Sequence, residues 1–292
     1  MNKNYFFIIN PVHLKKAKSL ETQIHLFFKE RNDKYQIFIS KNSSHLIQLT
    51  NKAVALGVDV IIACGGDGTV NQIGQLIIEK KIKLGIIPIG SGNGISNHFN
   101  ISTNYQQALK IIVRDVSKKM DIGKVDNRYF FSNIGFGMGV EFIRHYNKNK
   151  IHGLLGYIPS FLKSLFSFTP PNIEIITENQ TISATPNILL IANTNQQGYG
   201  LSLTPEAKTD DGSFNLVIAS KTNIFIFNYL IIMILLGFSI KRKRSVSYHD
   251  LKNFKITSKN YYINIQIDGE FYFVMKNELN IRILPKAIDV LC

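Results

Sequence analysis

Residues 60–71 read VIIACGGDGTVN, an apolar run that ends abruptly in three glycines around one aspartate. The run is short and does not alternate with polar residues, which predicts a buried parallel strand. Glycine lets the backbone turn sharply and approach a ligand closely, because no Cβ stands in the way. Ile73, Leu76 and Ile77 then follow at helical spacing. A strand, a glycine-rich turn and a helix N-terminus are together typical of a phosphate site, since free N–H groups and the helix dipole attract the anion.

The aspartate inside this loop, Asp67, makes the prediction more specific. A loop that only holds phosphate would not carry a carboxylate, because the two anions repel each other. The carboxylate is explained if a divalent cation or a transferable proton lies between the aspartate and the phosphates. The alternative is that Asp67 only tightens the turn, as aspartate often does.

The composition limits the classes of partner. The chain has 292 residues, of which 45% are hydrophobic, and this is enough for two domains with packed cores. Lys and Arg number 34 against 20 Asp and Glu, which gives a formal net charge of +14. A basic balance indicates an anionic partner such as a nucleotide, a nucleic acid or a membrane surface. Nucleic acid is disfavoured, because no motif for it is present and the lysines are spread out apart from one cluster.

The cysteines and the N-terminus indicate the compartment. Cys64 and Cys292 lie far apart, and Cys64 falls in the predicted buried strand. They form neither a disulfide framework nor a metal-ligand spacing, which fits a reducing compartment. The N-terminus enters a strand at Tyr5 without the layout of a signal peptide. These features predict a cytoplasmic protein.

Residues 1–120 are predicted to form an α/β domain, because short apolar runs alternate there with helical patterns. This alternation predicts a parallel sheet with right-handed crossovers, and ligands of such sheets bind beyond the carboxyl ends of the strands. Asn10, Ser40, the GGDGT loop and the GSGNG loop at 90–94 all follow predicted strands. The expected strands are 5–9, 35–39, 60–64 and 84–89, and the expected helices are 15–29, 46–56, one that runs to about residue 80, and 105–113.

Residues 121–292 are predicted to form a second, β-rich and sandwich-like domain, from which the C-terminal tail returns to the first domain. Alternation is clear at 261–267, and the pair Asp268-Gly269 is typical of a hairpin turn. The expected strands are 129–134, 172–177, 187–193, 214–219, 254–257, 261–267, 271–274 and 280–284.

Two apolar segments, 154–168 and 222–240, interrupt the β-rich domain. The second has no charged residue and ends in Lys241-Arg242-Lys243-Arg244. Its length approaches that of a transmembrane helix. Two asparagines, a glycine and its position between predicted strands of one domain argue against a span. Two alternatives remain open for 222–240: a core helix beside a solvated charge cluster, or a helix that lies on an anionic membrane surface.

Four motifs follow one another along the chain: GGDGTVNQ at 65–72, PIGSGNG at 88–94, DDGSFN at 210–215 and DGE at 268–270. Their order resembles that of the diacylglycerol kinase catalytic-domain family, and the resemblance covers essentially the whole chain. This family includes diacylglycerol, sphingoid-base and ceramide kinases and similar bacterial lipid kinases. The resemblance implies that residues 1–120 are a nucleotide-binding α/β domain like that of NAD kinases and phosphofructokinases. It also implies that residues 121–292 are a β-rich lipid-substrate domain, with ATP and Mg²⁺ in the cleft between the two. The implied reaction transfers the γ-phosphoryl group to a lipid hydroxyl.

The resemblance also implies roles for single residues. Glu270 resembles the proposed general base. Asp67, Asp121 and Asp268 resemble members of the active metal network. Asp211, with the backbone carbonyls of Lys208 and Ser213, is similar to a structural Mg²⁺ site. For Glu270 and Asp211, the alternative is an ordinary turn carboxylate. The positions that correspond to nucleotide contacts are Asn10, Ser40, Gly65, Gly66, Asp67, Gly68, Thr69, Val70, Asn71, Ser91, Gly92 and Asn93.

The chain departs from the family pattern at several positions. Gly94 stands where the family often has aspartate, so one carboxylate of the metal network is missing. The usual Ser-Gly does not follow Asn10-Pro11, Gln72 replaces a common Glu, and Asn215 replaces an Asp. Glu270 and Asp67 are both retained.

The main hypothesis is a cytoplasmic lipid kinase on the inner membrane face, with a lipid substrate and an anionic membrane surface as partners and no nucleic acid. An NAD kinase is the first rival, because it shares GGDGT, although PIGSGNG and the long apolar segments favour lipid. The second rival is a catalytically weak nucleotide- or lipid-binding regulator, which Gly94 and the altered Asn-Pro segment suggest. The lipid is not identified, and an edge strand leaves a homodimer open.

Overall fold

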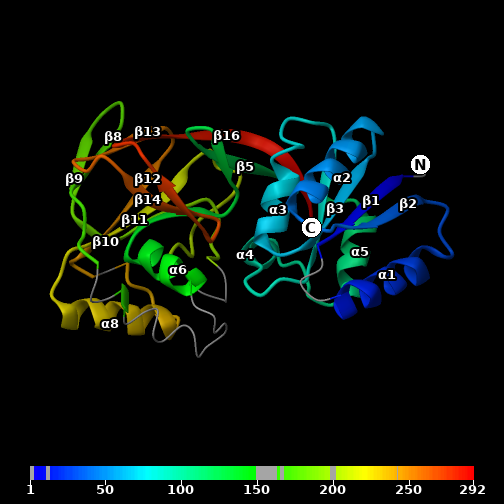
Figure 1. Ribbon diagram of the computed structural model, residues 1–292, viewed down its shortest axis with the longest axis horizontal. Coiled ribbons are helices and arrows are strands. Elements are labelled where there is room, and N and C mark those ends of the chain that lie inside the picture. Colours follow the sequence, from blue (N-terminus) through cyan, green and yellow to red (C-terminus); the bar gives the residue numbers. More distant parts are fainter. Residues whose placement is uncertain (1–2, 11–13, 149–162, 165–167, 198–201, 242) are drawn as a thin grey trace.

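The computed structural model of the chain describes residues 3–10, 14–148, 163–164, 168–197, 202–241 and 243–292. Within these residues the strands form one sheet of ten strands and one of six. Figure 1 shows two lobes side by side, an α/β lobe on the right and a β-rich lobe on the left. The predicted fold class, a parallel α/β domain followed by a β-rich sandwich, is confirmed.

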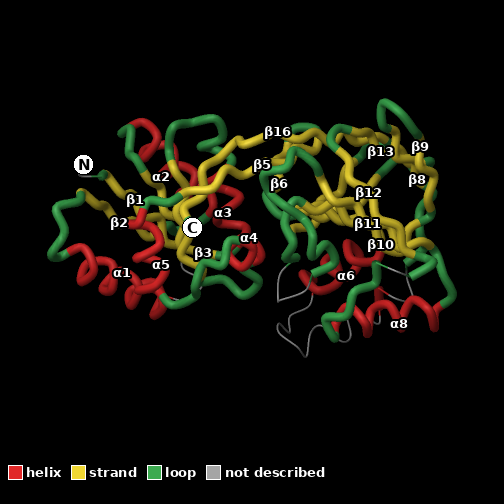
Figure 2. The backbone as a smooth tube through the Cα atoms, turned by 180° about the vertical axis from the view of Figure 1, so that it is seen from behind, coloured by secondary structure: helices red, strands yellow, loops and turns green. Residues whose placement is uncertain are grey.

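The α/β lobe is built on four parallel strands, in the order β2 (Lys34–Ile39), β1 (Asn4–Ile9), β3 (Val60–Gly65) and β4 (Lys83–Pro88). β3 is buried along its whole length, as its unbroken apolar run predicts. Helices cover both faces of this sheet (Figures 1 and 2). α1 (Leu14–Phe28) packs beside α5 (Tyr105–Arg114), and α2 (Ser43–Ala55) packs beside α3 (Asp67–Gly74).

The β-rich lobe is a sandwich. Its antiparallel six-stranded sheet has the order β12 (Val246–Leu251), β11 (Phe214–Ser220), β10 (Pro186–Ala192), β7 (Asn133–Gly137), β14 (Ile263–Ile267) and β15 (Glu270–Val274). The facing layer belongs to the ten-stranded sheet. It contains β13 (Phe254–Ser258), β8 (Ile173–Ile176), β9 (Thr181–Ala184) and β6 (Arg128–Phe130).

Alternation along β10 shows how the layers are packed. Leu189 and Ile191 enter the core between the two sheets. Leu190 and Ala192 point the other way, into a second cluster that contains Leu230 of α8 (Ile224–Leu235). Successive side chains of a strand face opposite sides of the sheet, so one strand serves both clusters. The six-stranded sheet is therefore covered by the facing sheet on one side and by helices on the other.

Two long strands cross between the lobes, β5 (Ser117–Val125) and β16 (Glu278–Leu291). They pair with each other along most of their length. β16 begins in the sandwich, where Ile281 pairs with Phe254, and ends in the α/β lobe, where Val290 pairs with Leu84. Figures 1 and 2 show both strands bridging the lobes. The C-terminal strand thus extends the parallel sheet of the first lobe.

Several element predictions are wrong or incomplete. The helix expected to run to about residue 80 ends at Gly74. A Cβ on Gly74 would lie 2.4 Å from the ring of Phe131. Glycine at this position therefore lets the end of α3 pack closely against Phe131. The stretch expected as one strand at 129–134 divides into β6 and β7.

Five elements were not predicted: α4 (Gly94–His98), α6 (Met138–Lys148), β5, β9 and β12. The sequence GFGMG around the start of α6 disfavours a helix on propensity alone. β9 and β12 are short and largely polar or exposed, so they lack the alternation that marks a strand.

The two apolar segments have different outcomes. Most of 154–168 lies outside the described residues. The segment 222–240 contains α8, a helix as both alternatives for this segment expected. None of the helices in the described part of the chain is long and apolar enough to cross a bilayer.

Candidate active site

The two glycine loops meet at the carboxyl ends of β3 and β4. A Cβ on Gly90 would lie 2.5 Å from the Cα of Gly66, and a Cβ on Gly65 would lie 2.2 Å from Thr69 Oγ1. Neighbouring parallel strands end at the same edge of the sheet, which brings the loops together. The contact leaves no room for side chains, so the loops present backbone to whatever binds there.

Asp67 connects these two loops. Its carboxylate accepts hydrogen bonds from the backbone N–H groups of Gly94, at 2.9 Å, and Ile95, at 3.0 Å. Both donors lie in the first turn of α4, where N–H groups have no partner within the helix. Asp67 therefore holds the second loop against the first, in addition to any role toward a cation.

Asn93 has a conformation that suits a ligand site. It adopts a left-handed backbone with φ of +49°, and its Nδ2 donates to the carbonyl of Gly90 at 2.8 Å. Its Oδ1 is buried, and in the described structure it has no hydrogen-bond partner. That oxygen lies 3.0 Å from where a Cβ of Gly90 would stand. An acceptor without a partner beside two bare glycine loops fits a ligand donor, such as a nucleotide hydroxyl or a Mg²⁺-bound water.

The other predicted nucleotide-binding side chains lie at the same strand ends. Asn10 Nδ2 donates to Thr69 Oγ1 at 2.9 Å, which ties the end of β1 to α3. Ser40 is buried and its hydroxyl donates to the carbonyl of Ile9 at 3.3 Å. Val70 is a core residue, so only its backbone can serve a ligand. Ser91 is exposed, and the carbonyl of Gly92 accepts from the side chain of Asn97.

Asp268 brings the second lobe to this site. Its carboxylate accepts from Asn71 Nδ2 at 2.7 Å and from the backbone N–H groups of residues 131–133 at 2.8–2.9 Å. Burial raises the pKa of Asp268 to about 6, against the opposing effect of these donors. Its left-handed φ of +46° starts the DG turn. The contact with Asn71 joins α3 to the hairpin β14–β15.

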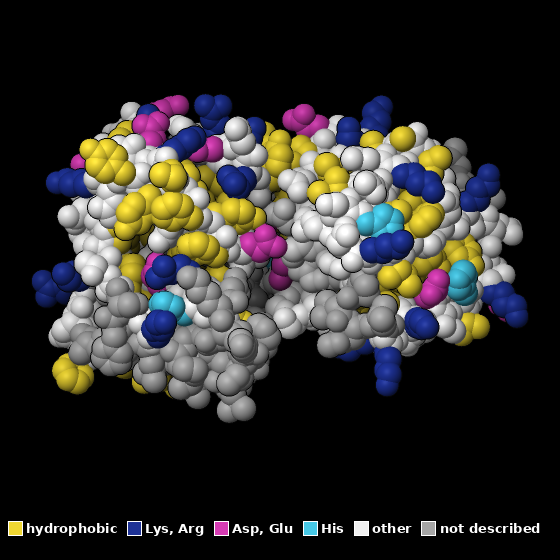
Figure 3. All heavy atoms as spheres, in the orientation of Figure 1, with side chains coloured by type: hydrophobic (Ala, Val, Ile, Leu, Met, Phe, Trp, Pro, Cys, Tyr) yellow, Lys and Arg dark blue, Asp and Glu magenta, His cyan; other side chains and the backbone are white. Residues whose placement is uncertain are grey.

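Glu270 follows in the same hairpin, at the rim of a cleft of about 370 Å³. Its Oε1 lies 3.6 Å from the position that a Cβ of Gly68 would take, so the carboxylate approaches the glycine loop directly. Tyr272 donates its hydroxyl to Glu270 Oε2 at 2.9 Å. Burial raises the pKa of Tyr272 to about 12, and the hydrogen bond to Glu270 and its charge act in the same direction. The phenol therefore stays protonated and can donate. Figure 3 shows the surface hollowed where the lobes meet.

The cleft also contains residues that were not predicted. Arg128 places its guanidinium 4.8 Å from the ring centroid of Tyr272. Ser43 donates to Gln72 Oε1 at 2.9 Å on the opposite wall. Asn71, Asp268 and Glu270 are the predicted side chains in the lining. The missed residues come from β6, α2 and β15, and no local pattern marks them, because only the packing of the two lobes brings them to one cleft.

The other predicted metal residues lie outside this lining. Asp121 is buried in β5, where its two oxygens accept from the backbone N–H groups of Gly212, at 2.7 Å, and Lys286, at 2.6 Å. Asp211 accepts from the N–H and the hydroxyl of Ser213, both at 3.0 Å, as in a tight turn. Lys208 is exposed. No three His, Cys, Asp or Glu side chains of the described residues are grouped as a metal site. The metal roles therefore stay predictions.

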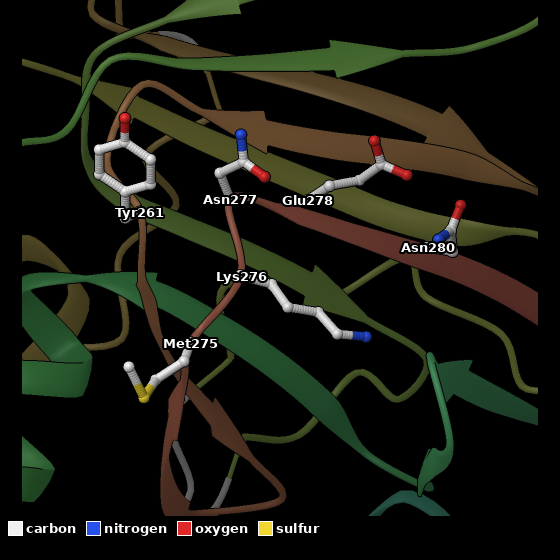
Figure 4. Close-up of a pocket in the computed structure, with 6 residues that line it drawn as sticks. All are labelled: Tyr261, Met275, Lys276, Asn277, Glu278 and Asn280. Carbon is white, nitrogen blue, oxygen red and sulfur yellow. The ribbon is translucent and has the colours of Figure 1, made fainter.

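A second hollow, of about 490 Å³, lies beyond the far end of the β14–β15 hairpin (Figure 4). It is lined by Tyr261, Met275, Lys276, Asn277, Glu278 and Asn280. Lys276 there forms an ion pair with Asp126 at 3.0 Å. None of its lining residues belongs to a glycine loop or to the DGE motif. Of the predicted site residues this hollow contains none, whereas the cleft beside Glu270 is lined by Gly68, Asn71, Asp268 and Glu270.

Two family models match successive parts of the chain. Residues 4–125 match the family of the diacylglycerol kinase catalytic domain, and residues 132–292 match the YegS C-terminal NAD kinase beta sandwich-like domain. The diacylglycerol kinase of Staphylococcus aureus (strain JH9) is 30% identical over 245 residues, which cover 82% of this chain and 76% of that protein. The chain belongs to the diacylglycerol kinase family.

Solved structures share the fold of this chain. A diacylglycerol kinase from Bacillus anthracis str. Sterne superposes with a TM-score of 0.73 at 18% identity, over 99% of this chain and 96% of that one. Yeast NADH kinase, solved with NADH, gives a TM-score of 0.58 at 9% identity, over 99% of this chain and 83% of that one. The fold of this chain is thus shared with yeast NADH kinase.

Proposed function

We propose that this chain is a lipid kinase that uses ATP and Mg²⁺ to phosphorylate a lipid hydroxyl, of the diacylglycerol or sphingoid-base type. The observation that carries the proposal is the approach of Glu270 to Gly68 across the cleft. A carboxylate from one lobe meets the glycine loop of the other, which is the arrangement that a phosphoryl transfer to a hydroxyl requires. Membership of the diacylglycerol kinase family supports the same reaction.

The chain's own groups suit the nucleotide. The bare backbone of Gly65, Gly66 and Gly90 suits phosphates. α3 begins directly after Gly66, so its N-terminus favours an anion. The unpaired Oδ1 of Asn93 suits a donor on the bound nucleotide or on a metal-bound water. Mg²⁺, held by Asp67 and Asp268, would supply positive charge to the phosphates.

Glu270 accepts the proton in the proposed reaction. The lipid oxygen forms a bond to the γ-phosphorus, the bond from that phosphorus to the β–γ bridging oxygen breaks, and ADP leaves. The hydroxyl proton passes to the Glu270 carboxylate. Tyr272 orients that carboxylate through its hydrogen bond to Oε2 and leaves Oε1 on the side of Gly68. Arg128 packs on the ring of Tyr272 and keeps this support in place.

The test is a transfer assay with γ-labelled ATP, Mg²⁺ and mixed micelles that carry diacylglycerol, dihydrosphingosine, ceramide or phosphatidylglycerol. We expect one labelled lipid with the wild type and a loss of about 100-fold or more with Glu270→Gln, which keeps the shape but cannot take the proton. Nucleotide affinity, measured by calorimetry, should stay within about twofold in this variant. Glu178→Gln, at an exposed turn, is the matched control and should retain full activity.

Three results would contradict the proposal. Full transfer by Glu270→Gln would remove Glu270 as the base. ATP binding without a labelled lipid, together with labelling of NAD in a parallel reaction, would replace the lipid by a dinucleotide. Binding without transfer to any acceptor would leave a regulator.

A further inference from the structure

The helix α8 has an unusual balance of composition and burial. Its sequence, IFIFNYLIIMIL, has no charged residue, and apolar side chains occur around its whole circumference. A helix that is apolar all round is normally buried on every side. Here Phe227 and Leu230 are buried, and Leu230 packs on the outer face of the six-stranded sheet. The opposite face is exposed.

The exposed face is continuous along the helix. Phe225, Tyr229, Ile232 and Leu236 follow one another at spacings of four, three and four residues, which places them on one side of a helix. Phe225 is 81% exposed and Leu236 is 66% exposed. Ile226 and Phe238 extend this face and are also exposed. A continuous face of exposed apolar side chains marks a site of interaction rather than an ordinary solvent-facing surface.

Basic residues border the same face. Lys243 donates to the hydroxyl of Tyr229 at 3.0 Å, and its ammonium lies 5.0 Å from the ring centroid of that tyrosine. Arg244 is exposed next to it. Lys241 forms an ion pair with Glu206, an exposed carboxylate beside this end of the helix. An apolar face edged by a tyrosine and cations matches the boundary between hydrocarbon and anionic head groups.

From these contacts we propose that α8 is the membrane-docking surface of this protein, and that its occupant is the surface of a bilayer containing anionic lipid. The helix lies in the plane of the interface, with Phe225, Ile232 and Leu236 inserted and Lys243 and Arg244 at the phosphates. Twelve residues span only about 18 Å, too short for a crossing of about 30 Å. The helix therefore lies on the bilayer and does not span it.

This placement has a consequence for catalysis, which rests on the proposed function. α6 and α8 lie along the same side of the β-rich lobe (Figures 1 and 2). α6 contacts β14 and β15, the hairpin strands that flank Asp268 and carry Glu270. Docking through α8 holds the lobe with the general base at the surface where a lipid hydroxyl is found.

The experiment is co-sedimentation of the full chain with vesicles, without ATP. Vesicles of phosphatidylcholine alone are compared with vesicles of equal parts phosphatidylcholine and phosphatidylglycerol. The double variant Phe225→Ser/Leu236→Ser is expected to lower the partition coefficient by about tenfold or more. The matched control is Leu26→Ser on α1, where the leucine is 64% exposed but no such face exists, and its partition should match the wild type. Lys243→Gln/Arg244→Gln should weaken binding to the anionic vesicles only, by about fivefold per cation.

The readout is independent of turnover. If the kinase proposal fails, vesicle binding and its loss in the α8 variant are still expected. If the docking proposal fails, the wild type and the Phe225→Ser/Leu236→Ser variant should still transfer phosphate to a short-chain lipid dispersed as monomers, because that lipid needs no bilayer. Equal vesicle binding by the wild type and the Phe225→Ser/Leu236→Ser variant would overturn the inference. A second result would also overturn it: a wild type that does not bind vesicles and is a dimer by sedimentation equilibrium, with the Phe225→Ser/Leu236→Ser variant a monomer. A second copy of the chain would then occupy the face.

Discussion

At the scale of single residues, glycines with similar motifs have different tasks. Gly90 and Gly65 have no room for a Cβ, because backbone or side-chain atoms lie within 2.5 Å of where it would stand. Gly68 has room, and the nearest atom to its Cβ position is Glu270 Oε1 at 3.6 Å. Gly90 and Gly65 therefore serve packing, whereas Gly68 leaves space between the loop and the carboxylate.

Alanine substitution separates these tasks. Gly90→Ala is expected to lose about 1–3 kcal/mol of unfolding free energy, because the backbone of Gly66 must move away. Gly68→Ala lies within helix α3 and is expected to keep or gain up to about 1 kcal/mol. Urea unfolding measures both values. The same Gly68→Ala protein should lose about tenfold or more of the transfer rate, since its methyl group occupies the space before Glu270. A Gly68→Ala protein that is both stable and fully active would contradict this role.

At the scale of elements, α4 is the link between the glycine loops and the second lobe. Its first turn donates to Asp67. Its last residue, His98, places Nδ1 at 2.7 Å from Asn195 Oδ1 and Nε2 at 3.3 Å from Thr209 Oγ1, both in the β-rich lobe. Burial lowers the pKa of His98 below its usual 6.5, and the hydrogen bond to Asn195 opposes this effect. The charge of Lys118 lowers the pKa further, and that of Asp210 raises it. The interlobe contact is thus made by a neutral imidazole.

This shift predicts a pH dependence of stability. Below pH 6.5 the unfolded chain takes up a proton at this histidine more readily than the folded protein does. The contribution of His98 to the unfolding free energy is therefore fully present above pH 6.5 and is lost as the pH falls through the lower folded value. Urea unfolding should show that the unfolding free energy falls less steeply from neutral to mildly acidic pH in His98→Gln than in the wild type. His25→Gln, at an exposed position on α1, should follow the wild-type curve.

At the scale of the whole molecule, β5 and β16 belong to the ten-stranded sheet, which runs through both lobes. Val290 is fully buried and pairs with Leu84 on one side and Lys118 on the other. Separate domains often unfold in separate transitions. Here the shared strands couple the lobes, so we expect a single calorimetric transition.

A proline tests the coupling. Val290→Pro removes an N–H from a central strand and is expected to cost about 3 kcal/mol or more. Val290→Ala keeps the N–H and should lose only packing. Calorimetry should show one lowered transition for Val290→Pro, because both lobes depend on β16. Two separate transitions in the wild type would contradict the coupling.

Much of the architecture follows from local sequence alone. The apolar run at 60–64 predicts the central strand, the glycines after it predict the phosphate loop, and Asp268-Gly269 predicts the hairpin turn, because each pattern depends on backbone conformation and side-chain periodicity within a few residues. The helix at 222–240 is likewise predicted, and α8 is found there. The motif order identifies the family without any structure.

Only the tertiary structure decided which partners these residues have. Asp67 meets Gly94 and Ile95, and Asn71 meets Asp268 from 197 residues away. Local patterns did not decide whether α8 is a core helix or a surface helix. Periodicity shows which residues are apolar, but not how many sides of the helix are covered by other elements. Hydrogen bonds and burial depend on atoms that lie far apart in the chain, and their positions are set only when both lobes pack around β5 and β16.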